Sequence, residues 1–121
     1  MIDAERKAMS LLLACRFQRG SKASSFLEDL RWELNRNPNY KNTFAQAHHL
    51  WRLVWKYRRQ IQNIEITSLA FYHHQTGKLP DLYRDGDVRP EGREEFLAEQ
   101  TEREEFQKGA KQRVANSRRL F

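Results

Sequence analysis

The sequence predicts an all-α protein: a small domain of about four helices, with one long central amphipathic helix and an extended, charged C-terminal helix. Apolar residues recur every three or four positions, and no alternating apolar and polar run of strand length occurs. Glycine, proline and asparagine divide the chain into four such stretches. A chain of 121 residues with 39% apolar content suffices for one core. We therefore expect a helical core domain over residues 1–90 and a charged helix over 91–121, in the same domain or as an interaction arm.

The first helix is predicted over residues 3–17. Asp3 can cap its start, Leu12 and Cys15 share its apolar face, and Gly20 ends it. Cys15 is the only cysteine, so an internal disulfide is impossible. A free cysteine among leucines is expected to be a buried thiol and not a nucleophile.

A capping box of Ser25 and Glu28 predicts the start of a second helix, in which the hydroxyl and the carboxylate each accept from a backbone amide. The helix should end near Arg36, because Pro38 disfavours helical geometry at the residue before it. Its buried stripe is expected to contain Leu27, Leu30 and Leu34, flanked by Phe26 and Trp32.

Thr43 and Gln46 form another capping box, and neither glycine nor proline follows until Gly77. This pattern predicts one helix of about 50 Å at 1.5 Å per residue, or a helix bent near the β-branched residues of QNIEIT. A three-four spacing places one apolar seam along it, with Leu50, Val54 and Ile61 expected in the core. The seam contains Ala47, Leu50, Val54, Tyr57, Ile61, Ile64, Ser68 and Phe71.

The segment 91–121 has an ordered charge pattern after a long predicted loop. Residues 91–105 contain seven glutamates against two arginines, and residues 106–121 contain five cations and no acid. Acids at the start and cations at the end stabilise a helix through its macrodipole. Few apolar residues accompany them, so we expect an exposed helix that binds a second copy or another protein. Its interaction residues would be Phe106, Ala110, Val114 and Phe121.

The net charge of +6 lies entirely in residues 1–90, because residues 91–121 sum to zero. No acid occurs between Glu33 and Glu65. Helical spacing aligns a stripe opposite the apolar seam, with Trp51 and Trp55 at its boundary. The stripe contains His48, Arg52, Lys56, Arg59 and Asn63. Cations beside an aromatic ring are typical of nucleic-acid binding, although the basic outer side of a core helix fits equally well. The predicted nucleic-acid-binding residues are His48, Arg52, Trp55, Lys56, Arg58 and Arg59.

Two histidine pairs, His48-His49 and His73-His74, contain side chains that can bind metals or transfer protons. On one straight helix, corresponding members would lie about 37 Å apart, so they could share an ion only if the chain folded back between them. Neither pair has the spacing of a helical zinc site. The sequence therefore predicts no metal, no cofactor and no enzymatic activity.

The predicted function is that of a non-enzymatic, basic helical protein that docks on nucleic acid or on an assembly containing it. No helix-turn-helix signature or zinc-finger spacing supports sequence-specific recognition. The alternative is a structural, adaptor or inhibitor protein, such as a phage-type virion or accessory component, acting through protein contacts or self-association. No apolar run reaches the roughly 18 residues of a membrane span, and no small-molecule substrate is evident. We expect a cytoplasmic or virion-associated protein.

Overall fold

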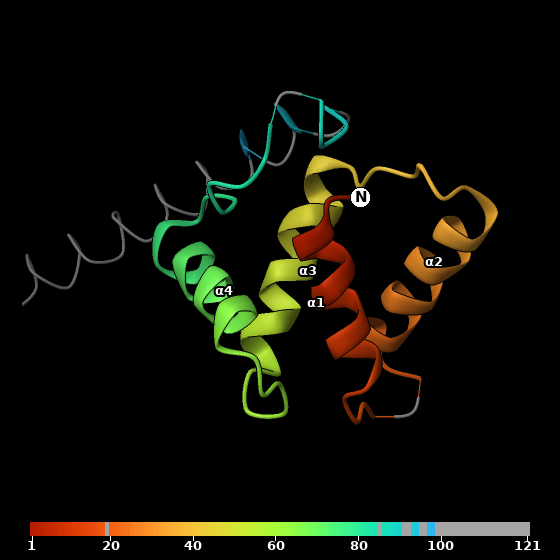
Figure 1. The fold of residues 1–121 in the computed structure, drawn as a ribbon, viewed down its shortest axis with the longest axis vertical. Helices are drawn as coiled ribbons and strands as arrows, with labels where there is room; N and C mark the ends of the chain where they lie inside the picture. The colour runs from red at the N-terminus through yellow and green to blue at the C-terminus, as the bar shows by residue number, and fades with distance from the viewer. Residues whose placement is uncertain (19, 85, 91–92, 95–96, 99–121) are drawn as a thin grey trace, which may run out of the picture. The chain divides into compact units, whose positions relative to one another are not determined.

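The computed structural model describes residues 1–18, 20–84, 86–90, 93–94 and 97–98. The all-α class is confirmed, with four named helices in the described part of the chain: α1 (Asp3–Leu13), α2 (Lys22–Arg36), α3 (Phe44–Lys56) and α4 (Ile64–Thr76). Successive helices run in opposite directions, and α1 lies between α2 and the α3–α4 pair (Figure 1).

The chain divides into two compact units, Met1–Pro90 and Glu91–Phe121. All four named helices belong to the first unit. The predicted C-terminal helix lies outside the described residues, except for 93–94 and 97–98. The same applies to all its predicted interaction residues: Phe106, Ala110, Val114 and Phe121.

The boundaries of α1 and α2 differ from those predicted. The helix α1 ends at Leu13 instead of residue 17, and the backbone of Arg16 bonds to the side chain of Gln60. The helix α2 begins one turn earlier than the Ser25 capping box predicted, because the Ser21 hydroxyl accepts from the Ser24 amide at 3.2 Å. Its end at Arg36 is confirmed.

The central segment is not one helix, which corrects the prediction of a continuous one. The predicted cap is confirmed, since Thr43 and Gln46 each accept a hydrogen bond from the other's backbone amide. The chain then leaves the helix after Lys56 and turns back through residues 57–63, which overlap the first two residues of the segment QNIEIT where a bend was expected. The Asn63 side chain caps α4 by accepting from the Ile66 amide at 3.1 Å. Folding back buries α3 and α4 against each other, which one straight helix could not do.

The predicted apolar seam is buried at the tested positions up to Ile61, but it does not match the buried side of α4. Leu50, Val54 and Ile61 are buried as predicted. Ile64 is 85% exposed and Phe71 is 49% exposed, because the turn rotates α4 relative to the spacing that held along α3. The helix α4 buries a different set of residues: Ile66, Ala70 and His73.

The core is formed by all four helices. Trp51 is fully buried, although spacing placed it at the boundary, and Cys15 is half-buried with the pKa of its thiol raised by burial. The predicted stripe of α2 is confirmed at Leu27 and Leu30, whereas Trp32 is 58% exposed. The buried apolar cluster contains Ala8, Leu12, Ala23, Leu27, Leu30, Leu50, Trp51, Leu53, Val54, Ile61, Ile66 and Ala70.

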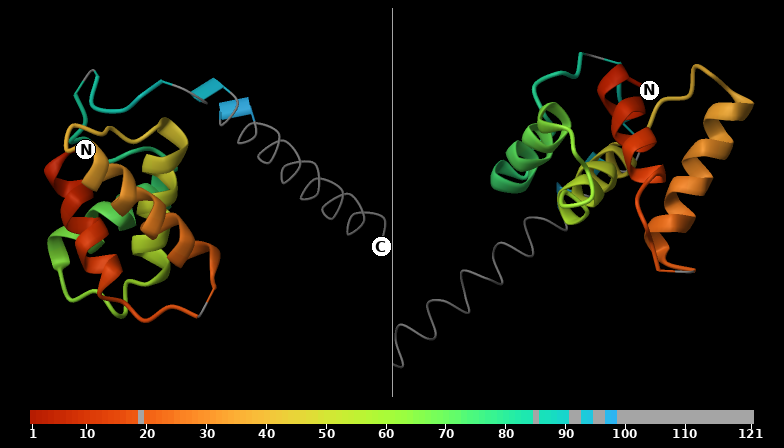
Figure 2. Two further views of the ribbon diagram at one scale, coloured as in Figure 1. Left: turned by 90° about the vertical axis from the view of Figure 1, so that its right-hand side faces the viewer. Right: turned by 60° about the horizontal axis from the view of Figure 1, so that its bottom comes forward.

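The segment after α4 returns to the start of α3. Gly77 ends α4 in the left-handed conformation, with φ of 68°, which glycine adopts without strain. Farther on, the Arg89 amide donates to the Asn42 carbonyl at 2.9 Å, and the Phe44 amide donates to the Arg89 carbonyl at 3.1 Å. In both views of Figure 2 this return segment runs along the end of the domain that contains the N-terminus. It closes the end opposite the α3–α4 turn.

Candidate nucleic-acid interface

Two segments far apart in the sequence meet at one end of the domain. They are the loop 14–21 after α1 and the turn 57–63 after α3, both at the bottom of Figure 1. The Gln60 side chain accepts from the Arg16 amide at 2.8 Å and donates to the Arg16 carbonyl at 3.3 Å. The rings of Phe17 and Tyr57 pack edge to face with centroids 4.7 Å apart. These contacts fix the two segments side by side.

The joined segments create a concentration of positive charge. Neither contains an aspartate or a glutamate. We call the exposed cations at this end the basic end: Arg16, Lys56, Arg58 and Arg59. Three of the four were predicted as binding residues. Arg16 was missed because its proximity to the turn is a tertiary contact, and no sequence pattern relates positions 44 residues apart.

The predicted basic stripe does not run along one helix. Arg52 and Lys56 are exposed on α3, but Arg59 belongs to the turn beyond its end, as does its neighbour Arg58. The Arg58 guanidinium donates to the Trp55 carbonyl at 2.8 Å, which holds this side chain back over α3. The stripe is therefore an exposed face of α3 that continues into the basic end.

His48 does not belong to the exposed face, which corrects its prediction as a binding residue. It is 2% exposed, and its Nδ1 lies 2.8 Å from Nε2 of His73 on α4. Burial, together with the neighbouring charge of Arg52, lowers the pKa of His48 and of His73 to about 4 in each case. Both imidazoles are then neutral at pH 7, and one ring donates its N–H to the other. The pair serves the packing of α3 on α4.

Trp55 is half-buried and lies between two polar side chains. The Arg58 guanidinium carbon lies 4.0 Å from the centroid of its ring. The ring of His74 stacks on the indole with centroids 4.6 Å apart and planes inclined by 20°. Phe71 lies beside them, 5.5 Å from Trp55 between centroids. We call Arg58, Trp55 and His74 the Trp55 stack.

A buried polar network, which sequence reasoning did not find, lies at the opposite end. Glu5 is fully buried and accepts from the Asn42 side-chain amide at 2.9 Å and from the Tyr83 hydroxyl. Tyr83 in turn accepts from Trp51 Nε1 at 2.8 Å. Burial raises the pKa of Glu5 and that of Tyr83. The acid lies on the predicted helix face next to Ala8, but only the fold shows what surrounds it.

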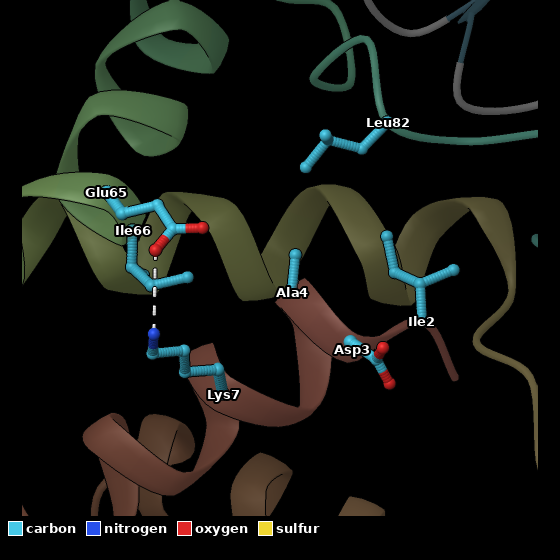
Figure 3. Close-up of a pocket in the computed structure, with 7 residues that line it drawn as sticks. All are labelled: Ile2, Asp3, Ala4, Lys7, Glu65, Ile66 and Leu82. Carbon is cyan, nitrogen blue, oxygen red and sulfur yellow. Dashed lines mark ion pairs between the residues drawn. The ribbon is translucent and has the colours of Figure 1, made fainter.

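A pocket of about 460 Å³ lies between α1 and α4. Figure 3 shows the Lys7 ammonium and the Glu65 carboxylate facing each other across it, joined by an ion pair of 3.5 Å. Both side chains are largely exposed, so water screens the pair and its contribution to stability is small. The full lining is Ile2, Asp3, Ala4, Lys7, Glu65, Ile66 and Leu82. The lining carries two carboxylates, Asp3 and Glu65, against one cation, Lys7, and the ion pair engages that cation, so the pocket has no positive charge left to attract a phosphate.

The fold brings one member of each histidine pair together. His48 and His73 bond directly to each other, while His49 packs against Phe26 and His74 against Trp55. Among the residues that the structure describes, no group of three or more histidine, cysteine or acidic side chains could hold a metal ion. Within the same residues, no helix is long and apolar enough to cross a membrane.

These features leave the basic end and the adjoining face of α3 as the candidate interface. Its chemistry is that of a cationic surface with an aromatic ring at its border. Comparisons of this chain with protein-family models, with curated proteins and with solved structures found no match.

Proposed function

We propose that this protein is a non-enzymatic binder of nucleic acid, or of an assembly that contains nucleic acid. It would contact phosphates through the basic end and through Arg52 on α3. The main support is the contact between Arg16 and Gln60, because it joins two acid-free segments at one end of the domain. Such a protein would act in the cytoplasm or as part of a virion.

Electrostatics would supply most of the binding free energy. Cations that lie within about 8 Å of one another add their potentials at physiological ionic strength. Arginine and lysine bound to phosphates release condensed counterions, so affinity falls steeply as salt concentration rises. Contacts of this kind position a protein on the backbone and do not read sequence. The proposed binding is therefore strong at low salt and independent of the base sequence.

Charge reversal at the basic end tests the proposal. A double variant, Lys56→Glu with Arg59→Glu, changes two exposed side chains. The matched control, Lys78→Glu with Arg84→Glu, makes the same change in charge at exposed positions near the opposite end of α4. Binding to labelled DNA is measured by anisotropy between about 50 and 200 mM salt.

The first variant should lose at least tenfold in affinity at low salt, and its salt dependence should flatten by roughly one unit of slope for each lost phosphate contact. The control variant should lose much less affinity, because it has the same net charge as the first variant but its substitutions lie away from the basic end. Equal losses in the two variants would show a non-specific effect of net charge. DNA binding as tight as that of the parent would refute the proposed function.

A different observation supports a second candidate function, the binding of another protein. Ile64 is 85% exposed on α4, and Phe71 on the same helix is 49% exposed. Apolar side chains exposed together are typical of protein contacts, as expected of an adaptor, inhibitor or virion component. Sedimentation of the parent and of Ile64→Ser tests this function. A concentration-dependent oligomer that the substitution dissociates would favour protein docking over nucleic-acid binding.

A further inference from the structure

In the Trp55 stack, two planar polar side chains pack against one tryptophan ring. The Arg58 guanidinium covers one side of the indole at 4.0 Å, and the His74 ring covers another at 4.6 Å. The hydrogen bond from Arg58 to the Trp55 carbonyl holds the guanidinium in place. Arg58 and His74 are both exposed. The planar side chains of Arg58 and His74 are therefore exposed to solvent, and both pack against the indole of Trp55.

The surroundings of the stack are aromatic on one side and cationic on the other. Phe71 lies 5.5 Å from Trp55 and is 49% exposed. Arg52, three residues before Trp55 on α3, is adjacent to it on the helix surface. Lys56 follows Trp55 in the sequence, and its ammonium lies 5.6 Å from the centroid of the Tyr57 ring. No acid occurs in the sequence between Glu33 and Glu65. The surface thus combines planar side chains with positive charge.

We infer that the bases of single-stranded nucleic acid stack on this surface, on the Arg58 guanidinium, His74 and Phe71, while Arg52 and Lys56 bind the adjoining phosphates. The inference rests on the proposed function and names its substrate class. Bases stack on arginine planes and on aromatic rings with little regard to sequence. In a duplex the faces of the bases are occupied by their neighbours, so only a single strand can use such a surface.

The inference is tested with the full chain and two labelled ligands, an oligothymidylate of about 20 nucleotides and a duplex of equal length. The variants are Arg58→Lys, which keeps the charge and removes the plane, and Phe71→Ala at a half-exposed position. The matched control is Arg36→Lys. Arg36 also covers a tryptophan, Trp32, at 4.6 Å, but on α2 and bonded to Glu33.

Arg58→Lys and Phe71→Ala should each weaken single-strand binding roughly tenfold while changing duplex binding less than about twofold. Arg36→Lys should change neither. The oligothymidylate should also quench tryptophan fluorescence in Trp32→Phe protein, in which Trp51 is fully buried and the half-buried Trp55, in contact with Arg58 and His74, reports on the stack. Quenching needs no change at the stack, so it holds even if a stack variant folds poorly.

Three results would overturn the inference. If duplex and single strand bind equally and Arg58→Lys weakens neither, the protein binds phosphates alone and the proposed function survives. If neither ligand binds, the proposed function fails as well. If Phe71→Ala alters only the sedimentation of the protein, the surface of α4 is an interface between protein chains.

Discussion

The imidazole Nδ1 of His48 lies 2.8 Å from Nε2 of His73, although the two residues are 25 positions apart. One residue comes from α3 and the other from α4, and both are nearly inaccessible to water. This bond exists because the chain turns back at residues 57–63. On one straight helix the two histidines would lie far apart. In the folded protein they form a buried, neutral pair between α3 and α4.

Acid should weaken the fold through this histidine pair. The pKa of each residue is lowered from 6.5 to about 4 by burial, so the unfolded chain takes up protons before the folded one. Stability is complete above pH 6.5 and decreases as pH falls towards 4, by roughly 3 kcal/mol for one histidine at about 1.4 kcal/mol per pKa unit. Urea unfolding at several pH values measures this.

His73→Gln keeps a hydrogen-bonding group but cannot titrate, so its unfolding free energy should depend less on pH over the same range than that of the parent. His74→Gln, a substitution at an exposed position, is the control. Identical pH dependence in the parent and His73→Gln would show that the buried pair does not contribute to acid sensitivity.

The carboxylate of Glu5 should be replaceable by an amide but not by a methyl group. Glu5→Gln retains an acceptor for Asn42 and Tyr83 and avoids burying a charge, so at pH 8 it should be at least as stable as the parent. Glu5→Ala removes the acceptor of the Asn42 amide and of the Tyr83 hydroxyl and opens a cavity, at a cost of about 2–4 kcal/mol. Thermal unfolding of both variants at pH 8 measures this difference. Equal melting temperatures would show that the hydrogen bonds of Glu5 do not stabilise the fold.

Substituting alanine for a seam residue should cost much more stability on α3 than on α4. Leu50→Ala on α3 should cost about 2–5 kcal/mol, because the side chain is fully buried. Ile64→Ala on α4 should change stability by less than about 0.5 kcal/mol, because the side chain is 85% exposed. Both positions belong to the same three-four spacing. Similar costs for the two substitutions, measured by urea unfolding, would mean that the central helix continues through residues 57–63.

Truncation after Pro90 should leave a folded domain, because all four named helices lie within Met1–Pro90. Circular dichroism and a cooperative thermal transition would verify this. The predicted role of residues 91–121 in partner binding remains a prediction. Sedimentation of the full chain and of the truncated chain tests it, and the same oligomeric state in both would argue against self-association through Phe106, Ala110 and Val114.

Local sequence determined the helical class, the cap at Thr43 and Gln46, the end of α2 at Arg36, and the buried side of α3 at Leu50 and Val54. These features depend on residues within a few positions of each other, where spacing and capping rules apply. The absence of acids around the basic residues was also visible in the sequence.

Only the tertiary structure decided where the central segment turns, since residues 57–63 contain neither glycine nor proline. That turn buried His48 against His73, exposed Ile64, and joined Arg16 to Gln60. The physical reason is that a pattern of period 3.6 describes one helix alone. Burial of two helix faces against each other, and against α1, stabilises the fold more than continuing the helix would, and that balance depends on residues distant in the sequence.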